Sequence, residues 1–166
     1  MLSTNQKGAI AEARITAAAM ELGVVVLRPT IEGRRYDIVF DVGPRLLRVQ
    51  CKWATKKDDV VVIRTRTCRH TPRGYVRGTY SAEEIDAVAA WCSGTNECYF
   101  IPIERIDGQG FLHLRLGPTL NNQRLLVNWA SDYPLGAIAQ MGERLTGSQK
   151  AEGSSPSSST SEGPFW

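Results

Sequence analysis

Residues 46–53 read Leu-Leu-Arg-Val-Gln-Cys-Lys-Trp, an alternation of apolar and polar side chains that is typical of a β-strand. Because successive side chains of a strand point to opposite faces, Gln50 and Lys52 share one face. Polar groups among apolar neighbours are costly unless they are paired. The stretch therefore predicts either a polar cluster within a sheet or the solvated face of an edge strand.

Asp37 is the candidate partner of these two side chains. It lies thirteen residues before Gln50 in a predicted strand, Tyr36–Asp41, and Gly43-Pro44 turns the chain back between the two strands. A hairpin of these strands brings Asp37 across from Gln50 and Lys52. Hydrolysis of a phosphodiester requires an anionic site for a divalent metal and benefits from a nearby cation, so these three residues fit that chemistry.

Two helices and further strands are predicted around this hairpin. The first helix runs from about Gln6 to Leu22, with Asn5 as its N-cap and Gly23 as its stop. Ser81-Ala82-Glu83-Glu84 forms a capping box that starts a second helix, which ends near Trp91. The remaining predicted strands are Val24–Leu27, Val60–Arg66, Glu97–Ile103 and Phe111–Leu116. This order predicts a mixed sheet flanked by helices, of the α/β or α+β class, with a folded body that ends near Tyr133.

Length and composition fit one globular domain, since the chain has 166 residues of which 42% are apolar. No apolar run is long enough to cross a membrane and the N-terminus lacks the pattern of a signal peptide, so we expect a cytoplasmic protein. The four cysteines form no CxxC pair and are interpreted as reduced packing residues. The two histidines, His70 and His113, are too few and too scattered for an HNH or zinc site.

Positive charge is concentrated in one part of the chain. The segment Arg45–Arg77 holds ten Lys/Arg against two acids, Asp58 and Asp59, a local net charge of +8. Such a concentration indicates a polyanionic partner. The alternative is a solvated charged face.

The chemistry-bearing residues match a known family in the order in which they occur. Asn5 and Glu12 on the first helix, Tyr36-Asp37 on a strand and Arg48-Val49-Gln50-Cys51-Lys52 on the next resemble the PD-(D/E)XK homing endonucleases of bacterial group I introns. The resemblance covers roughly Asn5 to Tyr133. Further matching segments are Lys7-Gly8, Val60–Thr67, Tyr80-Ser81, Tyr99-Phe100-Ile101-Pro102 and Trp129–Tyr133.

This resemblance implies an α/β fold with the restriction-endonuclease-like core and a Mg2+-dependent endonuclease in which Mn2+ can substitute. Asp37 corresponds to the central metal ligand, helped by the Cys51 backbone carbonyl and by Glu12, directly or through water. Lys52 orients or activates the attacking water and screens the phosphate. Gln50 stands where the superfamily has an acid, which removes one anionic ligand. Glu12, Asp37, Gln50 and Lys52 are thus the candidate catalytic residues.

The partner implied is double-stranded DNA. Because one active site cuts one strand and both strands must be cut, we expect a homo-oligomer, either a dimer or a tetramer. Arginine side chains hold phosphates or read base edges, and the sequence does not say which does which. The candidate DNA-binding residues are Lys7, Arg64, Arg66, Arg69, His70, Arg73, Tyr75 and Arg77.

The composition shifts to Gly, Ser, Glu and Pro in the last thirty or so residues, so we expect residues 1–134 to form the nuclease domain and residues 135–166 a disordered tail. The tail can also be back-translated into a tRNA gene. Ala139–Arg144 can be encoded by a D-arm in which GCTC pairs with GAGC, and Gly153–Pro156 by a T-loop core. The back-translated sequence can also form the base-paired anticodon and acceptor stems, and the codons of Thr160-Ser161 can supply the CCA end. This hypothesis makes a tRNA gene the candidate DNA target. The alternative is that the tRNA gene is an unrelated neighbour, which the reading frame enters because a stop codon was missed.

Two alternative functions remain open from the residues. One is a junction resolvase or repair nuclease that recognises DNA shape. The other is a catalytically inactive DNA-binding protein of the same fold. This alternative remains because Gln50 stands where the superfamily has an acid.

Overall fold

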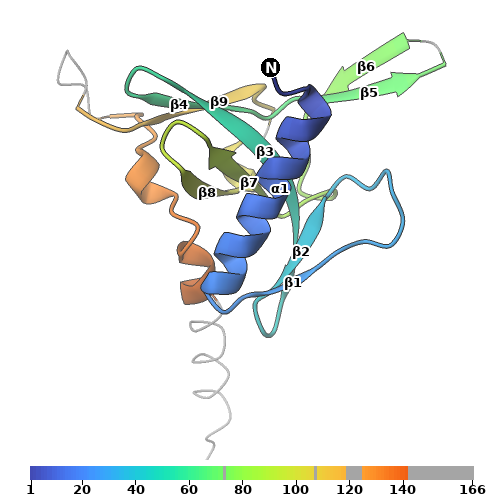
Figure 1. The fold of residues 1–166 in the computed structure, drawn as a ribbon, viewed down its shortest axis with the longest axis horizontal. Coiled ribbons are helices and arrows are strands. Elements are labelled where there is room, and N and C mark those ends of the chain that lie inside the picture. The colour runs from blue at the N-terminus through green and yellow to red at the C-terminus, as the bar shows by residue number, and fades with distance from the viewer. Residues whose placement is uncertain (73, 107, 119–124, 142–166) are drawn as a thin grey trace, which may run out of the picture.

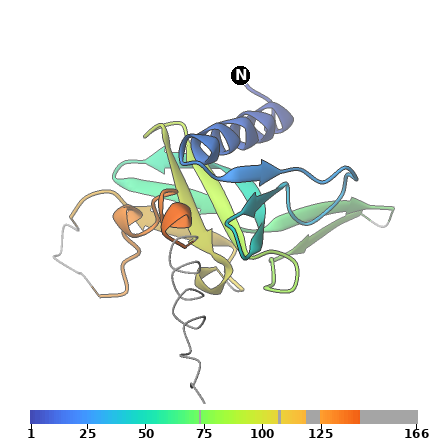
Figure 2. The same ribbon diagram turned by 90° about the horizontal axis from the view of Figure 1, so that it is seen from below.

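The computed structural model describes residues 1–72, 74–106, 108–118 and 125–141. One long helix, α1 (Thr4–Glu21), lies along one face of a seven-stranded sheet (Figures 1 and 2). The strands of this sheet are β1 (Val25–Leu27), β2 (Ile38–Asp41), β3 (Leu46–Lys57), β4 (Val60–Arg64), β7 (Ala87–Cys92), β8 (Glu97–Pro102) and β9 (Phe111–Arg115). Two short 3-10 helices, η1 (Ile103–Arg105) and η2 (Ala130–Asp132), follow β8 and precede the C-terminal segment.

The sheet is mixed and is organised around β3, a strand of 12 residues that is longer than the stretch predicted for it. β3 pairs antiparallel with β2 and β4 and parallel with β7, whereas all other pairs of the sheet are antiparallel. The order runs β1-β2-β3-β4-β9, with β7 and β8 attached to β3. The predicted hairpin of the second and third strands is therefore confirmed, as is the mixed sheet.

Helix α1 starts and stops on local signals. Ser3 is its N-cap, not Asn5 as predicted, and Ser3 and Gln6 form a reciprocal capping box. Asn5 is already inside the helix, because the Ser3 hydroxyl accepts the N–H of Gln6 at 3.2 Å. Gly23 follows the helix with a φ of 77°, the left-handed conformation that favours glycine, so the predicted stop is confirmed.

The predicted second helix is wrong. The capping interaction exists, since the Ser81 N–H donates to the Glu84 carboxylate at 3.3 Å, but the chain makes a single turn there. The Asp86 N–H then donates to the Arg48 carbonyl at 2.9 Å and the chain enters the sheet as β7. All six residues of β7 are buried because β3 and β8 flank it and both faces of the sheet are covered there. A short apolar run of this kind has no periodicity that separates a buried strand from a helix.

The Gly- and Arg-rich segment that follows Arg66, to which the sequence analysis assigned no helix or strand, forms a separate two-stranded sheet. Strand β5 (Thr67–Thr71) pairs antiparallel with β6 (Gly74–Gly78), and the pair projects away from the main sheet (Figure 1). This hairpin continues directly from the end of β4, so it extends the basic surface beyond the sheet.

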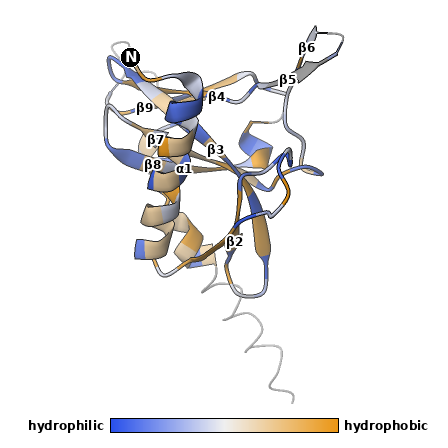
Figure 3. Cartoon of the chain, turned by 45° about the vertical axis from the view of Figure 1, so that its right-hand side comes forward, coloured by the Kyte–Doolittle hydropathy of each residue, from blue (hydrophilic) through white to orange (hydrophobic). Residues whose placement is uncertain are grey.

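Two apolar clusters hold the sheet between them. The first lies between α1 and the sheet and includes Ala11, Ile15, Phe40 and Val49; the second lies on the opposite face. In Figure 3 the strand β2 and much of α1 carry apolar residues. Central residues of the second cluster are Ile63, Tyr80, Ile85, Val88, Ile101 and Leu114.

The packed body extends past Tyr133, where the sequence analysis placed its end. Leu135 and Ile138 are 5% and 0% exposed and belong to the cluster beneath α1. Residues 142–166, the larger part of the predicted tail, lie outside the described residues. Within the described part, no helix is long and apolar enough to span a membrane.

Candidate active site

Asp37 lies immediately before β2, at the point where β2 and β3 separate. Its N–H donates to the Val49 carbonyl at 3.0 Å, which continues the antiparallel register by one residue. Its carboxylate Oδ2 accepts the backbone N–H of Cys51 at 2.8 Å and the side-chain amide of Gln50. The carboxylate thus takes the place of a strand partner for Cys51, and the contact between Asp37 and Gln50 predicted from the hairpin is present.

Gln50 contacts two of the oxygens that the resemblance assigns as metal ligands. Its Nε2 donates to Asp37 Oδ2 and to the Cys51 carbonyl, the latter at 3.4 Å. In this arrangement the amide acts as a donor that bridges the two oxygens. A half-turn of the amide group would present its carbonyl oxygen on the same side, where it could serve as a ligand.

The Asp37 carboxyl is held in a setting that disfavours its charge. Burial raises the pKa of Asp37, and the nearby carboxylate of Glu12 adds to this, while the Cys51 N–H, Lys52 and Gln50 act in the opposite direction. A carboxylate whose charge is incompletely compensated by the protein favours a bound cation. Burial also raises the pKa of the Cys51 thiol well above its usual range, so the thiol stays protonated at neutral pH and offers no thiolate.

Lys52 projects from the same face of β3 as Gln50 and reaches Tyr80. Its Nζ donates to the Tyr80 hydroxyl at 2.8 Å and lies 5.0 Å from the centre of the Tyr80 ring. Burial lowers the pKa of Lys52, and the charge of Asp37 partly offsets this. Sequence reasoning assigned no role to Tyr80, which is 28 residues away along the chain and carries no local signal of this contact.

Glu12 approaches the cluster from α1. It forms an ion pair with Arg28, which follows β1, and the side chains of Glu12 and Arg28 are 26% and 55% exposed. Glu12 lies close enough to Asp37 to raise the pKa of that carboxyl. The structure therefore brings all four predicted catalytic residues into one region, together with Arg28, which the sequence analysis did not single out.

These residues can provide oxygen donors for a hard divalent cation. Among the described residues there is no group of three or more His, Cys, Asp or Glu side chains with the geometry of a metal site. The available donors are the carboxylates of Asp37 and Glu12, the Cys51 carbonyl and, after rotation, the Gln50 amide oxygen. Mg2+ prefers such oxygen ligands and retains several waters, so a site with only two carboxylates suits it.

A basic groove of about 560 Å³ extends from Lys52 between the start of α1, β3, β4 and β9. Two aromatic residues form part of its walls. Lys7 Nζ lies 5.9 Å from the Trp53 ring centre, and Arg64 and Arg66 lie 5.5 and 5.7 Å from that of Phe111. None of the residues that line this hollow is acidic. Its basic residues are Lys7, Lys52, Lys57, Arg64 and Arg66.

The other predicted DNA-binding residues that the structure describes belong to the β5–β6 hairpin. Arg69 and His70 lie on β5, where they pair with Val76 and Tyr75, and Tyr75 and Arg77 lie on β6 with exposed side chains. Arg73 is outside the described residues. The predicted DNA-binding residues that the structure describes thus divide between the groove and the hairpin.

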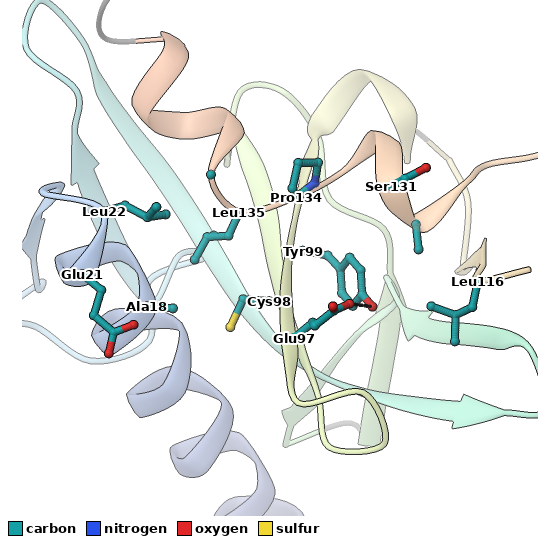
Figure 4. A pocket seen from close by; sticks show the side chains of 12 residues that line it. Ala18, Glu21, Leu22, Glu97, Cys98, Tyr99, Leu116, Ser131, Pro134 and Leu135 are labelled. Atoms are coloured by element: carbon teal, nitrogen blue, oxygen red, sulfur yellow. Dashed lines mark hydrogen bonds between the residues drawn. The ribbon is translucent and has the colours of Figure 1, made fainter.

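A second hollow, of about 630 Å³, lies between the C-terminal part of α1, β8 and residues 130–136 (Figure 4). Its walls include Ala18, Leu22, Cys98 and Leu135. None of the predicted catalytic or DNA-binding residues lines it, so it is separate from the candidate active site.

The sequence matches the family of PD-(D/E)XK endonucleases over residues 2–136. The chain belongs to this family, which confirms the resemblance and the fold class inferred from the residues. Among solved structures, the chain is similar to the bacterial homing endonuclease I-Ssp6803I, with a TM-score of 0.69 and 29% sequence identity. That similarity covers 87% of this chain and 99% of the other. A search of the curated proteins found no match.

Proposed function

We propose that this protein is a site-specific endonuclease of the homing type that cuts both strands of duplex DNA and requires Mg2+, with Mn2+ able to substitute. The observation that carries the proposal is the position of Asp37, Gln50 and Lys52. They form a polar cluster at the separation of two strands, and the basic groove begins at Lys52. The similarity to a homing endonuclease supports the same activity.

Each residue of the cluster has a distinct role in this proposal. Asp37 and the Cys51 carbonyl would hold the cation, Glu12 would complete the site directly or through water, and the Gln50 amide would turn its oxygen toward the ion. A divalent cation bound there supplies charge for the phosphate and lowers the pKa of a water molecule. Lys52 orients the attacking water and offsets the charge that develops on the phosphate oxygens.

The basic groove and the β5–β6 hairpin form the DNA-binding surface in this proposal. Lys7, Arg64 and Arg66 lie beside the cluster and contact phosphates close to the cut bond. The hairpin lies farther out and reads the adjoining DNA through Arg69, His70, Tyr75 and Arg77. Arg73, outside the described residues, is a further candidate from the sequence. Because one chain contains one such cluster, a dimer or tetramer is required to cut both strands.

The target is a tRNA gene in this proposal. Its support is the sequence of the C-terminal tail, which can be back-translated into a complete tRNA cloverleaf. A mobile nuclease gene inserted beside a tRNA gene would carry such an overlap at its 3′ end.

The test is cleavage of a plasmid that carries the intact tRNA gene with its uninterrupted flanks, in Mg2+ or in EDTA. We expect one double-strand cut with the wild type in Mg2+ and none with Lys52→Ala or in EDTA. Cuts at branched DNA independent of sequence would favour a junction or repair nuclease.

An inactive DNA-binding protein of the same fold is the second candidate, because Gln50 removes an anionic ligand. Tight binding of the plasmid fragment without any cut, and the same metal affinity in the wild type and Asp37→Ala, would establish it.

A further inference from the structure

The Lys52 ammonium contacts a residue outside the candidate active-site cluster. Lysine has a long side chain with many rotamers, and its charge is useful to a reaction only when it is held in place. In this structure the Nζ of Lys52 donates to the Tyr80 hydroxyl at 2.8 Å and lies 5.0 Å from the ring centre. Both contacts draw the ammonium toward Tyr80.

Tyr80 is itself rigidly held. It is 6% exposed and packs in the second apolar cluster with Ile85 and Val88. Arg35 lies over its ring, 5.6 Å from the ring centre. A buried aromatic ring packed in this way offers a fixed hydroxyl to a mobile side chain.

Arg35 is anchored in turn by the single turn that precedes β7. Its guanidinium donates to both carboxylate oxygens of Glu84, at 2.7 and 3.3 Å, and Glu84 also accepts the Ser81 N–H. The contacts therefore run from Glu84 through Arg35 and Tyr80 to Lys52. The turn at residues 81–84 thus anchors Arg35 although no helix follows it.

We propose that Tyr80 is a positioning residue that holds the Lys52 ammonium beside Asp37 for the cleavage step, with Arg35 and Glu84 fixing the ring. The proposal rests on the proposed nuclease function. Tyr80 acts through Lys52 and needs no contact with the DNA.

The test is the substitution Tyr80→Phe, which removes the hydroxyl and keeps the ring and its packing. We expect the single-turnover cleavage rate to fall about 10- to 100-fold, the scale of effect that a misplaced catalytic group produces. The DNA dissociation constant in EDTA and the thermal midpoint should stay near those of the wild type. Tyr133→Phe is the matched control, because Tyr133 is equally buried in the same cluster and its hydroxyl bonds Asn128 at 3.2 Å.

A double variant shows whether Tyr80 acts through Lys52. The residual single-turnover rate of Lys52→Ala, measured with excess enzyme over times far longer than the plasmid assay in which it shows no cut, should not fall further when Tyr80→Phe is added. Wild-type rates for Tyr80→Phe, or equal losses in cleavage and DNA affinity, would overturn the proposal.

A measurement without cleavage separates this proposal from the proposed function. Side-chain NMR relaxation of lysine Cε reports the order of Lys52 directly. We expect its order parameter to fall in Tyr80→Phe and to remain unchanged in Tyr133→Phe. An unchanged order parameter in both variants would show that Tyr80 does not hold Lys52, whereas a wild type that cuts no DNA would refute the nuclease function and leave the NMR result valid.

Discussion

The two carboxylates of the candidate active site are held in different ways. Asp37 extends the pairing of β2 with β3 and accepts a backbone N–H from Cys51, so the register of one hairpin determines where it lies. Glu12 projects from α1, is 26% exposed and pairs with Arg28. Its position depends on how a helix packs on the sheet and on one exposed arginine.

This difference separates a fixed ligand from an adjustable one. Asp37 has little freedom and little solvent to stabilise its charge, whereas Glu12 can change partner by rotating about its own bonds. We therefore expect loss of Asp37 to be decisive and changes at Glu12 or Arg28 to tune the affinity for the metal.

The largest effect is expected for Asp37→Asn, which removes the charge and nearly keeps the shape. Several kcal/mol of charge stabilisation by a bound cation correspond to a loss of cleavage of about a thousandfold or more. Cleavage of target DNA over a series of Mg2+ concentrations measures it. Asp41→Asn, at the other end of β2, should retain activity; equal losses in both variants would mean that the stability of this strand is responsible.

Glu12→Gln should be less severe. We expect the metal affinity to fall about 10- to 100-fold, which is typical for the loss of a residue that hydrogen-bonds or orients a metal ligand. A higher Mg2+ concentration should restore most of the cleavage rate. Calorimetric titration with Mn2+ gives the affinity without DNA. Glu21→Gln, on the same helix and away from the cluster, is the control. A loss of cleavage in Glu12→Gln that added Mg2+ does not restore would contradict the view of Glu12 as an adjustable ligand.

Gln50→Glu would replace the neutral amide of Gln50, one of the candidate metal ligands on β3, by a carboxylate. We expect about tenfold tighter binding of Mn2+, since the charge of the ligands sets the affinity of such sites. In the metal-free protein the added carboxylate should raise the pKa of Asp37 further and lower the thermal midpoint, because two like charges then lie in contact. Weaker Mn2+ binding in this variant would show that the amide itself is needed.

The pH dependence of stability should distinguish Asp37 from an exposed carboxyl. Because burial raises its pKa above the ordinary 3.8, protonated Asp37 is favoured in the folded state. Its contribution to stability is present below pH 3.8 and is lost as the pH rises through the raised pKa. In EDTA, Asp37→Asn should therefore gain thermal stability relative to the wild type as the pH rises from 4 to about 7. A difference that does not vary with pH would contradict this.

Arg28→Met should have the smallest effect. An ion pair with an exposed arginine contributes at most about 1 kcal/mol, so freeing Glu12 should tighten Mn2+ binding up to about fivefold. Calorimetry in EDTA-stripped buffer measures the change. Arg34→Met, close by in sequence and exposed, is the control. Weaker binding in Arg28→Met would show that Arg28 supports Glu12 and does not compete with the cation for it.

The two predicted helix starts show where sequence reasoning succeeds and where it fails. The first helix exists, although its N-cap is Ser3 and not the predicted Asn5, and it runs for 18 residues. The capping signal of Ser81 with Glu84 was identified from the sequence, yet it starts only a single turn. The helix α1 has an apolar stripe that a sheet can cover on one side. The residues of β7 are all apolar, and pairing with β3 and β8 buries every one of them.

The sequence by itself determined the β2–β3 hairpin and the cluster of Asp37, Gln50 and Lys52, because alternation and a turn are local properties of the chain. It also indicated the basic segment that lines the groove and forms the hairpin. Only the tertiary structure decided that β7 lies beside β3, that Tyr80 holds Lys52 and that Arg28 pairs with Glu12. Those contacts join residues far apart in the chain, and they form because packing around β3 outweighs the local preference of each segment.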